Sequence, residues 1–233
     1  MLYALRYPLS FAVLVVTFFA ALAIRGYAQR LVSRRRQPAW VRANTRSRRT
    51  SAWLKPFIDP YGCVAAALGG VGWGAPVDIT DPRDRRGQRV AQLLVGPIVL
   101  AGIGLGLLAA FRAWSHIGRQ PFGLLDVVHG AAWASSSLHY VLPFGQVALF
   151  LAGVEFLAMG ILALVPIPPL DGGKLLFALA PRRGGWQRAG YRLDEENWGV
   201  LILLVIGLPV LVRKVLLVSL LGAMVDPLVR LVA

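Results

Sequence analysis

Long stretches without a charged residue constrain this chain more than any other feature of its sequence. A helix that crosses a bilayer needs about 20 mostly apolar residues, or somewhat fewer when its ends reach the interface. The runs that carry no charge, or a single acid, cover residues 8–24, 90–111, 143–170, 198–212 and 215–225, and arginine-rich segments alternate with them. This pattern predicts an all-α polytopic membrane protein.

The composition supports this class and excludes others. Of the 233 residues, 57% are apolar, whereas soluble domains contain about 45–50%. The single cysteine, Cys63, excludes a disulfide framework and a cysteine zinc site. A net charge of +14 would suggest nucleic-acid binding, but its placement between apolar runs favours a role in topology. We therefore expect one membrane domain over residues 1–233, with five to six membrane-embedded elements and no nucleic-acid partner.

The basic residues predict the orientation. Residues 25–57, 78–89 and 174–192 hold ten, four and five Lys or Arg residues, against two in residues 112–142. The positive-inside rule places the three basic loops in the cytoplasm and the amino terminus outside, in a bacterial-type cytoplasmic membrane. The basic loops would also attract anionic lipid.

Three segments need separate treatment. Residues 59–77 are rich in glycine, which disfavours a regular helix, and lie between two basic loops, so we expect a re-entrant or interfacial segment. Residues 198–225 predict either one span with an interfacial piece or a hairpin bent at Gly207-Leu208-Pro209. Ala21-Leu22-Ala23 resembles a signal-peptide cleavage site, but the basic residues that follow oppose translocation, so we expect residues 8–24 to stay as the first core helix.

The most distinctive motif follows the predicted helix 143–165. Residues 166–174 read Pro-Ile-Pro-Pro-Leu-Asp-Gly-Gly-Lys. The prolines end the helix, and Asp171 is then held at the end of an apolar segment, where an acid is costly and indicates a function. A second interpretation is that Asp171 only caps a helix that begins near Lys174. The residues alone leave both open.

This motif resembles the site-2 protease family of M50-like intramembrane zinc metalloproteases, whose third core helix ends in a proline-rich segment with Leu-Asp-Gly. Other family landmarks follow in the same order: Asp59-Pro60-Tyr61-Gly62, Gly72-Trp73-Gly74-Ala75-Pro76-Val77, Asp81-Pro82-Arg83, Arg85-Arg86-Gly87 and, in the helix 90–111, Gly96-Pro97. The resemblance covers roughly residues 8–180 and implies a site-2-protease-like core.

The chain departs from the family at the catalytic motif. Working members carry His-Glu-x-x-His, in which two histidines share a helix face and bind zinc while the glutamate activates water. The alignment places Arg25 and Gln29 at the two histidines and Gly26 at the glutamate, and Ala163 replaces the family's asparagine. Only the third ligand position, Asp171, remains. The resemblance therefore implies a degenerate member without zinc and without catalysis.

An Asp171 without zinc needs another partner, because an unpaired buried acid is costly. Arg25 occupies the position of a former ligand, so its guanidinium is predicted to form a bidentate pair with Asp171, assisted by Gln29. In the alternative, Arg25 reaches the cytoplasmic interface and Asp171 caps a helix.

The leading interpretation of function is a pseudoprotease that binds other integral membrane proteins as a regulator, assembly factor or accessory subunit. By analogy with substrate clamping in the family, the predicted partner-binding region is Gly69, Gly70, Gly72, Trp73, Gly74 and Glu155. Glu155 has two further interpretations: a proton site, or a glutamate that faces a polar bundle interior. The small residues near it, Ala152, Gly153 and Gly160, favour close helix packing.

Two other classes stay open. An active metallopeptidase with a rearranged site would need His116, His129 or His139, with Asp126 as a further ligand, although these residues also fit an exposed loop helix. A small transporter would line its path with Glu155, Asp171 and Arg25, but the sequence shows no inverted repeat.

Overall fold

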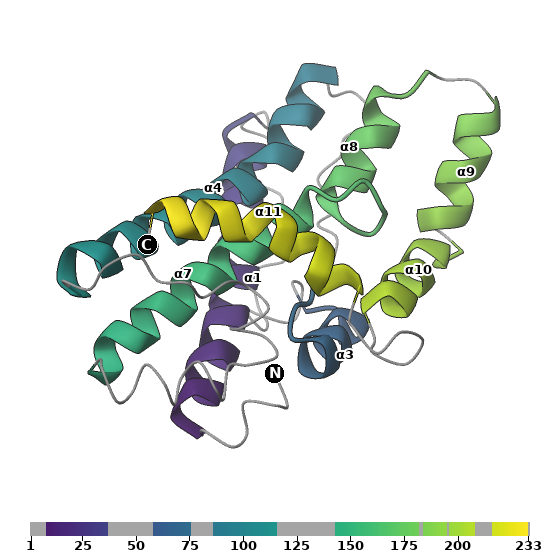
Figure 1. Ribbon diagram of the computed structural model, residues 1–233. Helices are drawn as coiled ribbons and strands as arrows, with labels where there is room; N and C mark the ends of the chain where they lie inside the picture. The colour runs from purple at the N-terminus through teal and green to yellow at the C-terminus, as the bar shows by residue number, and fades with distance from the viewer. Residues whose placement is uncertain are drawn as a thin grey trace, which may run out of the picture.

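The computed structural model describes residues 8–36, 58–75, 86–115, 143–181, 184–194, 196–207 and 216–232, and within these ranges all regular structure is helical. The helices are α1 (Pro8–Arg36), α3 (Pro60–Gly69), α4 (Arg86–Ser115), α7 (Phe144–Ala163), α8 (Asp171–Leu179), α9 (Gly184–Asp194), α10 (Trp198–Gly207) and α11 (Leu216–Val232). Figure 1 shows α7 near the centre, with α1, α4 and α11 around it.

Among the described residues, three helices are long and apolar enough to cross a membrane. They are α4, α7 and the part of α1 between Ser10 and Ser33, with 30, 20 and 24 residues. Nearly every residue of α7 from Gly153 to Ala163 is buried, which makes α7 the core of the bundle. The all-helical architecture and the three apolar helices are consistent with a helical membrane protein.

Glycines bring α4 and α7 close together. A Cβ added to Gly104 of α4 would lie 2.6 Å from the backbone nitrogen of Leu157, and one added to Gly153 of α7 would lie 2.9 Å from Leu108. Gly160 is equally tight, since its Cβ would lie 2.8 Å from the nitrogen of Ala101. The close packing predicted around Gly153 and Gly160 is confirmed.

Several predicted boundaries differ from the structure. The first helix continues past residue 24 to Arg36, so the segment 25–57 begins as helix and not as loop. Its residues 25–36 include arginine, alanine, glutamine and leucine, which favour helix. The helix predicted at 90–111 is α4, which begins at Arg86 and ends at Ser115, and the helix predicted at 143–165 is α7.

The described residues of the carboxyl-terminal region contain two helices after α9. Residues 198–225 hold α10 and most of α11, which continues to Val232. One face of α11 is buried in the core: Leu217, Val218, Leu221, Val225 and Val229. Figure 1 shows α11 crossing the bundle over α7 and α4. The proposed bend at Gly207-Leu208-Pro209 lies largely outside the described residues.

Candidate functional site: a buried ion pair

The first half of the site lies on α1. Arg25 and Gln29 are one helical turn apart, so their side chains share a face, and both residues are buried. Tyr27, between them in the sequence, is exposed. Gly26, at the position that the resemblance assigns to the general base, is buried and carries no side chain.

The second half of the site is the proline-rich turn after α7. Leu170 is the N-cap of α8, and Asp171 is the first helical residue. Gly172 and Gly173 lie so close to the backbone of Leu164 and Pro168 that a side chain at either position would clash. The two glycines therefore let α8 begin directly against the end of α7, where its first carboxylate faces α1.

The structure brings Arg25, Gln29 and Asp171 together. Arg25 donates from Nε to Oδ2 of Asp171 at 2.7 Å and from Nη2 to Oδ1 at 2.6 Å. Gln29 donates from Nε2 to the same Oδ2 at 2.9 Å. This is the bidentate pair that the sequence predicts, with the predicted help from Gln29. Fork-to-fork pairs of this kind are stronger and more directional than neutral hydrogen bonds.

The two alternative interpretations do not match this geometry. Arg25 is only 5% exposed, so its guanidinium does not reach an interface. Asp171 is 3% exposed, and α8 begins at Asp171 itself and not near Lys174. The N-cap residue of α8 is Leu170, whose apolar side chain cannot form a capping hydrogen bond. The amino-terminal end of α8 nevertheless favours a negative charge through the helix dipole.

A glycine of α4 provides the space for this cluster. A Cβ added to Gly96 would lie 2.9 Å from Cγ of Arg25 and 3.1 Å from Nε2 of Gln29. Gln92, one turn earlier on α4, is also buried. The Gly96-Pro97 landmark of the sequence therefore has a structural role, because α4 can approach the ion pair closely only where it lacks a side chain.

The residues of this site do not suit a zinc ion. Catalytic zinc takes three protein ligands and an open position, whereas this cluster offers a single carboxylate, and a guanidinium and an amide occupy both of its oxygens. Among the described residues, no group of three His, Cys, Asp or Glu is placed to hold a metal ion. His116, His129, His139 and Asp126 lie outside the described residues.

The glycine-rich segment after Asp59 forms a small helical unit. Asp59 caps α3 by accepting from the nitrogen of Tyr61 at 3.2 Å, and its other oxygen accepts from Nε1 of Trp73 at 2.6 Å. Gly62 and Gly72 lie too close together for side chains. The prediction of a poor helix is therefore wrong for residues 60–69, because Asp59 and Pro60 start a helix well and most of the glycines follow it.

The predicted partner-binding region is mostly buried. Among the described side chains, buried members of the set are Gly70, Gly72, Trp73, Gly74 and Glu155. Gly69 ends α3. These residues therefore offer no exposed docking surface in this chain, because Asp59 and the Gly62–Gly72 contact hold residues 71–75 against α3.

Glu155 is a second buried acid, far along α7 from the ion pair. It is 4% exposed, and its Oε1 has no hydrogen-bond partner among the described residues. Ala163, which replaces the family's asparagine, is buried at the end of the same helix.

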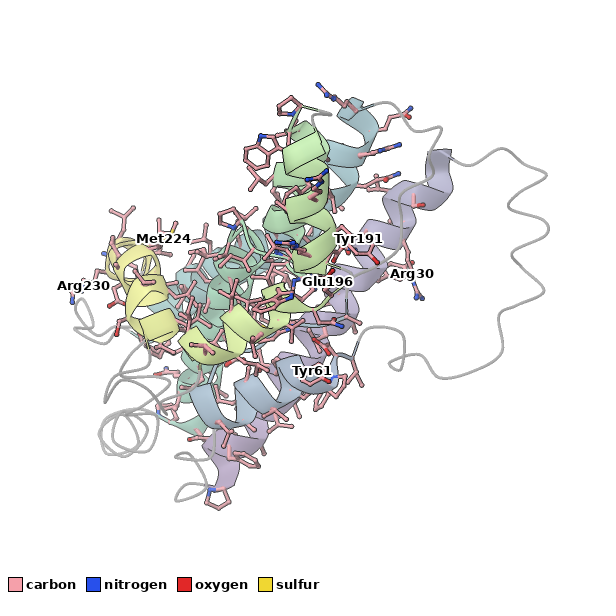
Figure 2. The ribbon with its side chains drawn as sticks, turned by 90° about the vertical axis from the view of Figure 1, so that its right-hand side faces the viewer. Arg30, Tyr61, Tyr191, Glu196, Met224 and Arg230 are labelled. Carbon is pink, nitrogen blue, oxygen red and sulfur yellow. The ribbon has the colours of Figure 1, made fainter. Side chains whose placement is uncertain are left out.

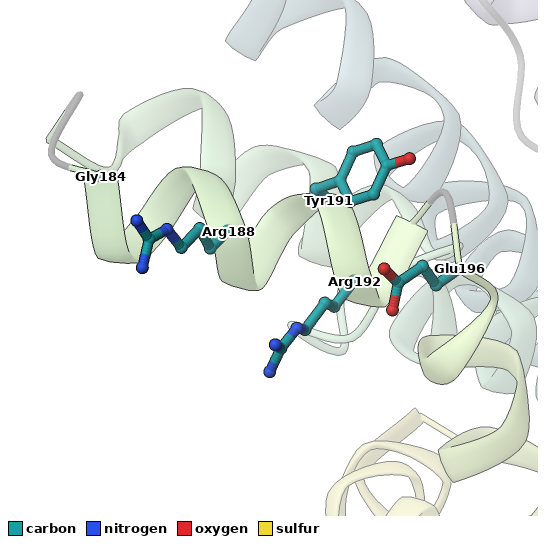
Figure 3. Close-up of a pocket in the computed structure, with 5 residues that line it drawn as sticks. All are labelled: Gly184, Arg188, Tyr191, Arg192 and Glu196. Atoms are coloured by element: carbon teal, nitrogen blue, oxygen red, sulfur yellow. The ribbon is translucent and has the colours of Figure 1, made fainter.

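Sequence reasoning missed one polar surface. Two contiguous shallow cavities on α9 and its connection to α10 involve Arg188, Tyr191, Arg192 and Glu196 (Figure 3). The spacing of Arg188 and Arg192 by one helical turn was available in the sequence. The prediction treats both arginines only as charges of a basic loop, and so it does not include the amphipathic helix α9 that carries them.

Comparisons with protein-family models, with curated proteins and with solved structures found no match for this chain.

Proposed function

We propose that this chain is a non-catalytic, site-2-protease-like integral membrane protein, a pseudoprotease in which an ion pair takes the structural role of the metal. It acts by binding other integral membrane proteins, as a regulator, an assembly factor or an accessory subunit of a membrane complex. Its orientation is that predicted by the charges, with the amino terminus outside a bacterial-type cytoplasmic membrane and the basic loops facing the cytoplasm and anionic lipid.

One observation carries this proposal. Arg25 and Gln29 meet Asp171 at hydrogen-bond distance although 146 and 142 residues separate them in the sequence. These are the three positions that the resemblance assigns to the metal ligands. If the alignment with the family were wrong, there would be no reason for Arg25 and Gln29, one turn apart on α1, both to meet this particular aspartate. The convergence therefore supports the family resemblance and the loss of zinc together.

The chemistry of the three positions supports a binding role. Arg25 remains cationic at any physiological pH and offers no lone pair to a metal. Gly26 provides no carboxylate to activate water. Hydrolysis by the family's mechanism would therefore lack both the ion and the base at this site. What the ion pair does provide is a fixed connection between α1 and α8.

The exposed face of α3 is the better candidate for partner contact, since the glycine segment behind it is buried. Tyr61, Val64 and Leu68 lie on this face, and each has at least two fifths of its surface exposed. Figure 2 shows Tyr61 pointing outward from α3. The helix has only 10 residues, so it presents a short apolar face rather than a full span.

The experiment combines metal content and partner capture on the full chain purified in mild detergent. We expect far less than one zinc per chain by mass spectrometry. A photo-crosslinking amino acid at Val64 is expected to capture a membrane protein. The same amino acid at Met224, an exposed apolar position on α11, is the matched control. About one zinc per chain would contradict the proposal, and equal capture at both positions would contradict the α3 surface.

A further inference from the structure

The surface of α9 and α10 contains two shallow cavities that meet. The first, of about 550 Å³, is lined by Gly184, Arg188, Tyr191, Arg192 and Glu196. The second, of about 580 Å³, is lined by Ala189, Arg192, Leu193, Glu196, Trp198 and Ile202. Because Arg192 and Glu196 line both, the two cavities form one continuous groove, which we call the α9–α10 groove.

One end of the α9–α10 groove is charged. Arg188 and Arg192 are exposed and leave successive turns of α9 on one side, with the Glu196 carboxylate directed towards them (Figure 3). Neither arginine forms an ion pair with a described residue. Two guanidinium groups one turn apart suit a phosphate, which accepts several hydrogen bonds from such forks. A carboxylate beside them suits a cationic group on the same ligand.

The other end of the groove is apolar. It is lined by Leu193, Trp198 and Ile202. Trp198 and Ile202 belong to α10, an uncharged helix on which Leu201 and Val205 are also exposed. The groove therefore changes from charged to apolar over a short distance, as a lipid does between its headgroup and its chains.

Aromatic residues mark the boundary between the two ends. Tyr191 lines the first cavity and Trp198 the second, and both are more than half exposed. Tyrosine and tryptophan are enriched at membrane–water interfaces, where one side of the ring is apolar and the other is wet. Their position fits a groove that lies at the level of lipid headgroups.

We propose that the α9–α10 groove binds one phospholipid with an amine-bearing headgroup. The phosphate lies between Arg188 and Arg192, the ammonium group pairs with Glu196, and an acyl chain follows Trp198 and Ile202 along α10. Arg188, Arg192 and Glu196 together carry a net charge of +1. The carboxylate of Glu196 beside the arginines gives an ammonium group a partner that a headgroup without an amine would not use. This inference is independent of the proposed pseudoprotease function.

The test is native mass spectrometry of the delipidated full chain in detergent, titrated with dioleoyl phosphatidylethanolamine or dioleoyl phosphatidylglycerol. We expect the ethanolamine lipid to bind at least tenfold more tightly than the glycerol lipid. The double variant R188Q/R192Q should lose at least tenfold in affinity for the ethanolamine lipid. E196Q should abolish the preference between the two lipids while keeping the phosphate contact.

The matched control is R112Q/R230Q, which removes two exposed arginines at the ends of α4 and α11. Figure 2 shows Arg230 far from Tyr191. This control should bind the ethanolamine lipid as the original chain does, and soluble glycerophosphoethanolamine should not compete. Three results would overturn the proposal. They are an equal loss of affinity in both double variants, equal binding of the two lipids, and competition by the soluble headgroup. Unchanged elution and melting temperature show that each variant is folded.

Discussion

Asp171 and Glu155 are two acids buried to the same extent in the same bundle, with 3% and 4% of their surface exposed. Their surroundings differ. Asp171 accepts three hydrogen bonds, two of them from a guanidinium. For Glu155, Oε1 has no partner among the described residues. Burial alone therefore does not identify a site; the partner supplied by a distant segment does.

The two acids also differ in how much stability the fold should lose when the acid or its partner is replaced. A buried ion pair is weak evidence for net stability, because desolvation offsets much of the attraction, yet removing one partner leaves an uncompensated charge and is strongly destabilising. Replacing an acid that forms no ion pair with a described residue, such as Glu155, should carry no such penalty. Four substitutions test this contrast, from the largest expected effect to the smallest.

Arg25→Met should destabilise the chain most, by about 3–5 kcal/mol, because it leaves the carboxylate of Asp171 buried without a cation. The measurement is unfolding in a detergent–SDS titration, followed by circular dichroism and by alkylation of Cys63. Burial and the charge of Asp59 raise the pKa of this thiol, so the folded chain should react slowly at neutral pH and faster once unfolded.

The double variant Arg25→Met/Asp171→Leu is the control for this prediction. It removes both charges and replaces them with apolar groups of similar volume, so it should recover most of the lost stability. A double variant as unstable as Arg25→Met would mean that the loss comes from packing and not from the unpaired buried charge of Asp171.

Gln29→Met should cost about 1.5–3 kcal/mol, since it removes one hydrogen bond to a charged group and keeps the volume. The same SDS titration measures the loss. Because Oε1 of Gln29 has no partner among the described residues, only its donor function is lost. A loss as large as that of Arg25→Met would contradict the assisting role of Gln29.

Gly104→Ala should cost about 1–3 kcal/mol through overpacking. Its new methyl group would lie 2.6 Å from the nitrogen of Leu157 and 2.9 Å from the oxygen of Gly153, on either side of Glu155. Gly102→Ala on the same helix is the matched control, because a Cβ there meets nothing within 4 Å and alanine favours helix. Equal melting temperatures for both variants would show that α4 and α7 are not closely packed.

Glu155→Gln should change the stability by less than about 1 kcal/mol, because the amide keeps the shape of a side chain that forms no ion pair with a described residue. Asp171→Asn is the matched comparison and should be destabilising on the scale of Arg25→Met, since it leaves the guanidinium unpaired. Measured side by side, equal losses would mean that Glu155 has an essential partner outside the described residues.

The sequence predicted the site better than the surface around it. The spacing of Arg25 and Gln29 fixes their common helix face, and a buried aspartate requires a cation. The choice of Arg25 as that cation depends on the family resemblance, which aligns Arg25 and Asp171 with metal ligands. The end of α1 is predicted too early, because Arg25 is the first charge after the apolar run, although no proline interrupts residues 25–36. The burial of Trp73 depends on a hydrogen bond to Asp59, 14 residues away, which no local pattern shows.

The same reasoning explains why the α9–α10 groove was missed. In the sequence alone, the arginines of residues 174–192 indicate topology. Their arrangement on one side of α9 depends on the residue at which that helix begins. Exposure of Tyr191 and Trp198 depends on how α9 and α10 pack together. Local patterns thus predict which residues can meet, and packing between distant segments decides which ones remain on the surface.

The central proposal is that positions 25, 29 and 171 correspond to the metal-ligand positions of the site-2 protease family, and that an ion pair takes the place of the metal there. Its most direct test is the zinc content of the variant Arg25→His/Gly26→Glu/Gln29→His, purified in detergent with zinc and then dialysed. The account predicts about one zinc per chain in this variant, far less in the original chain, and loss of the zinc when Asp171→Asn is added. Two results would contradict it: a folded triple variant that binds no zinc, or one that keeps its zinc when Asp171→Asn is added.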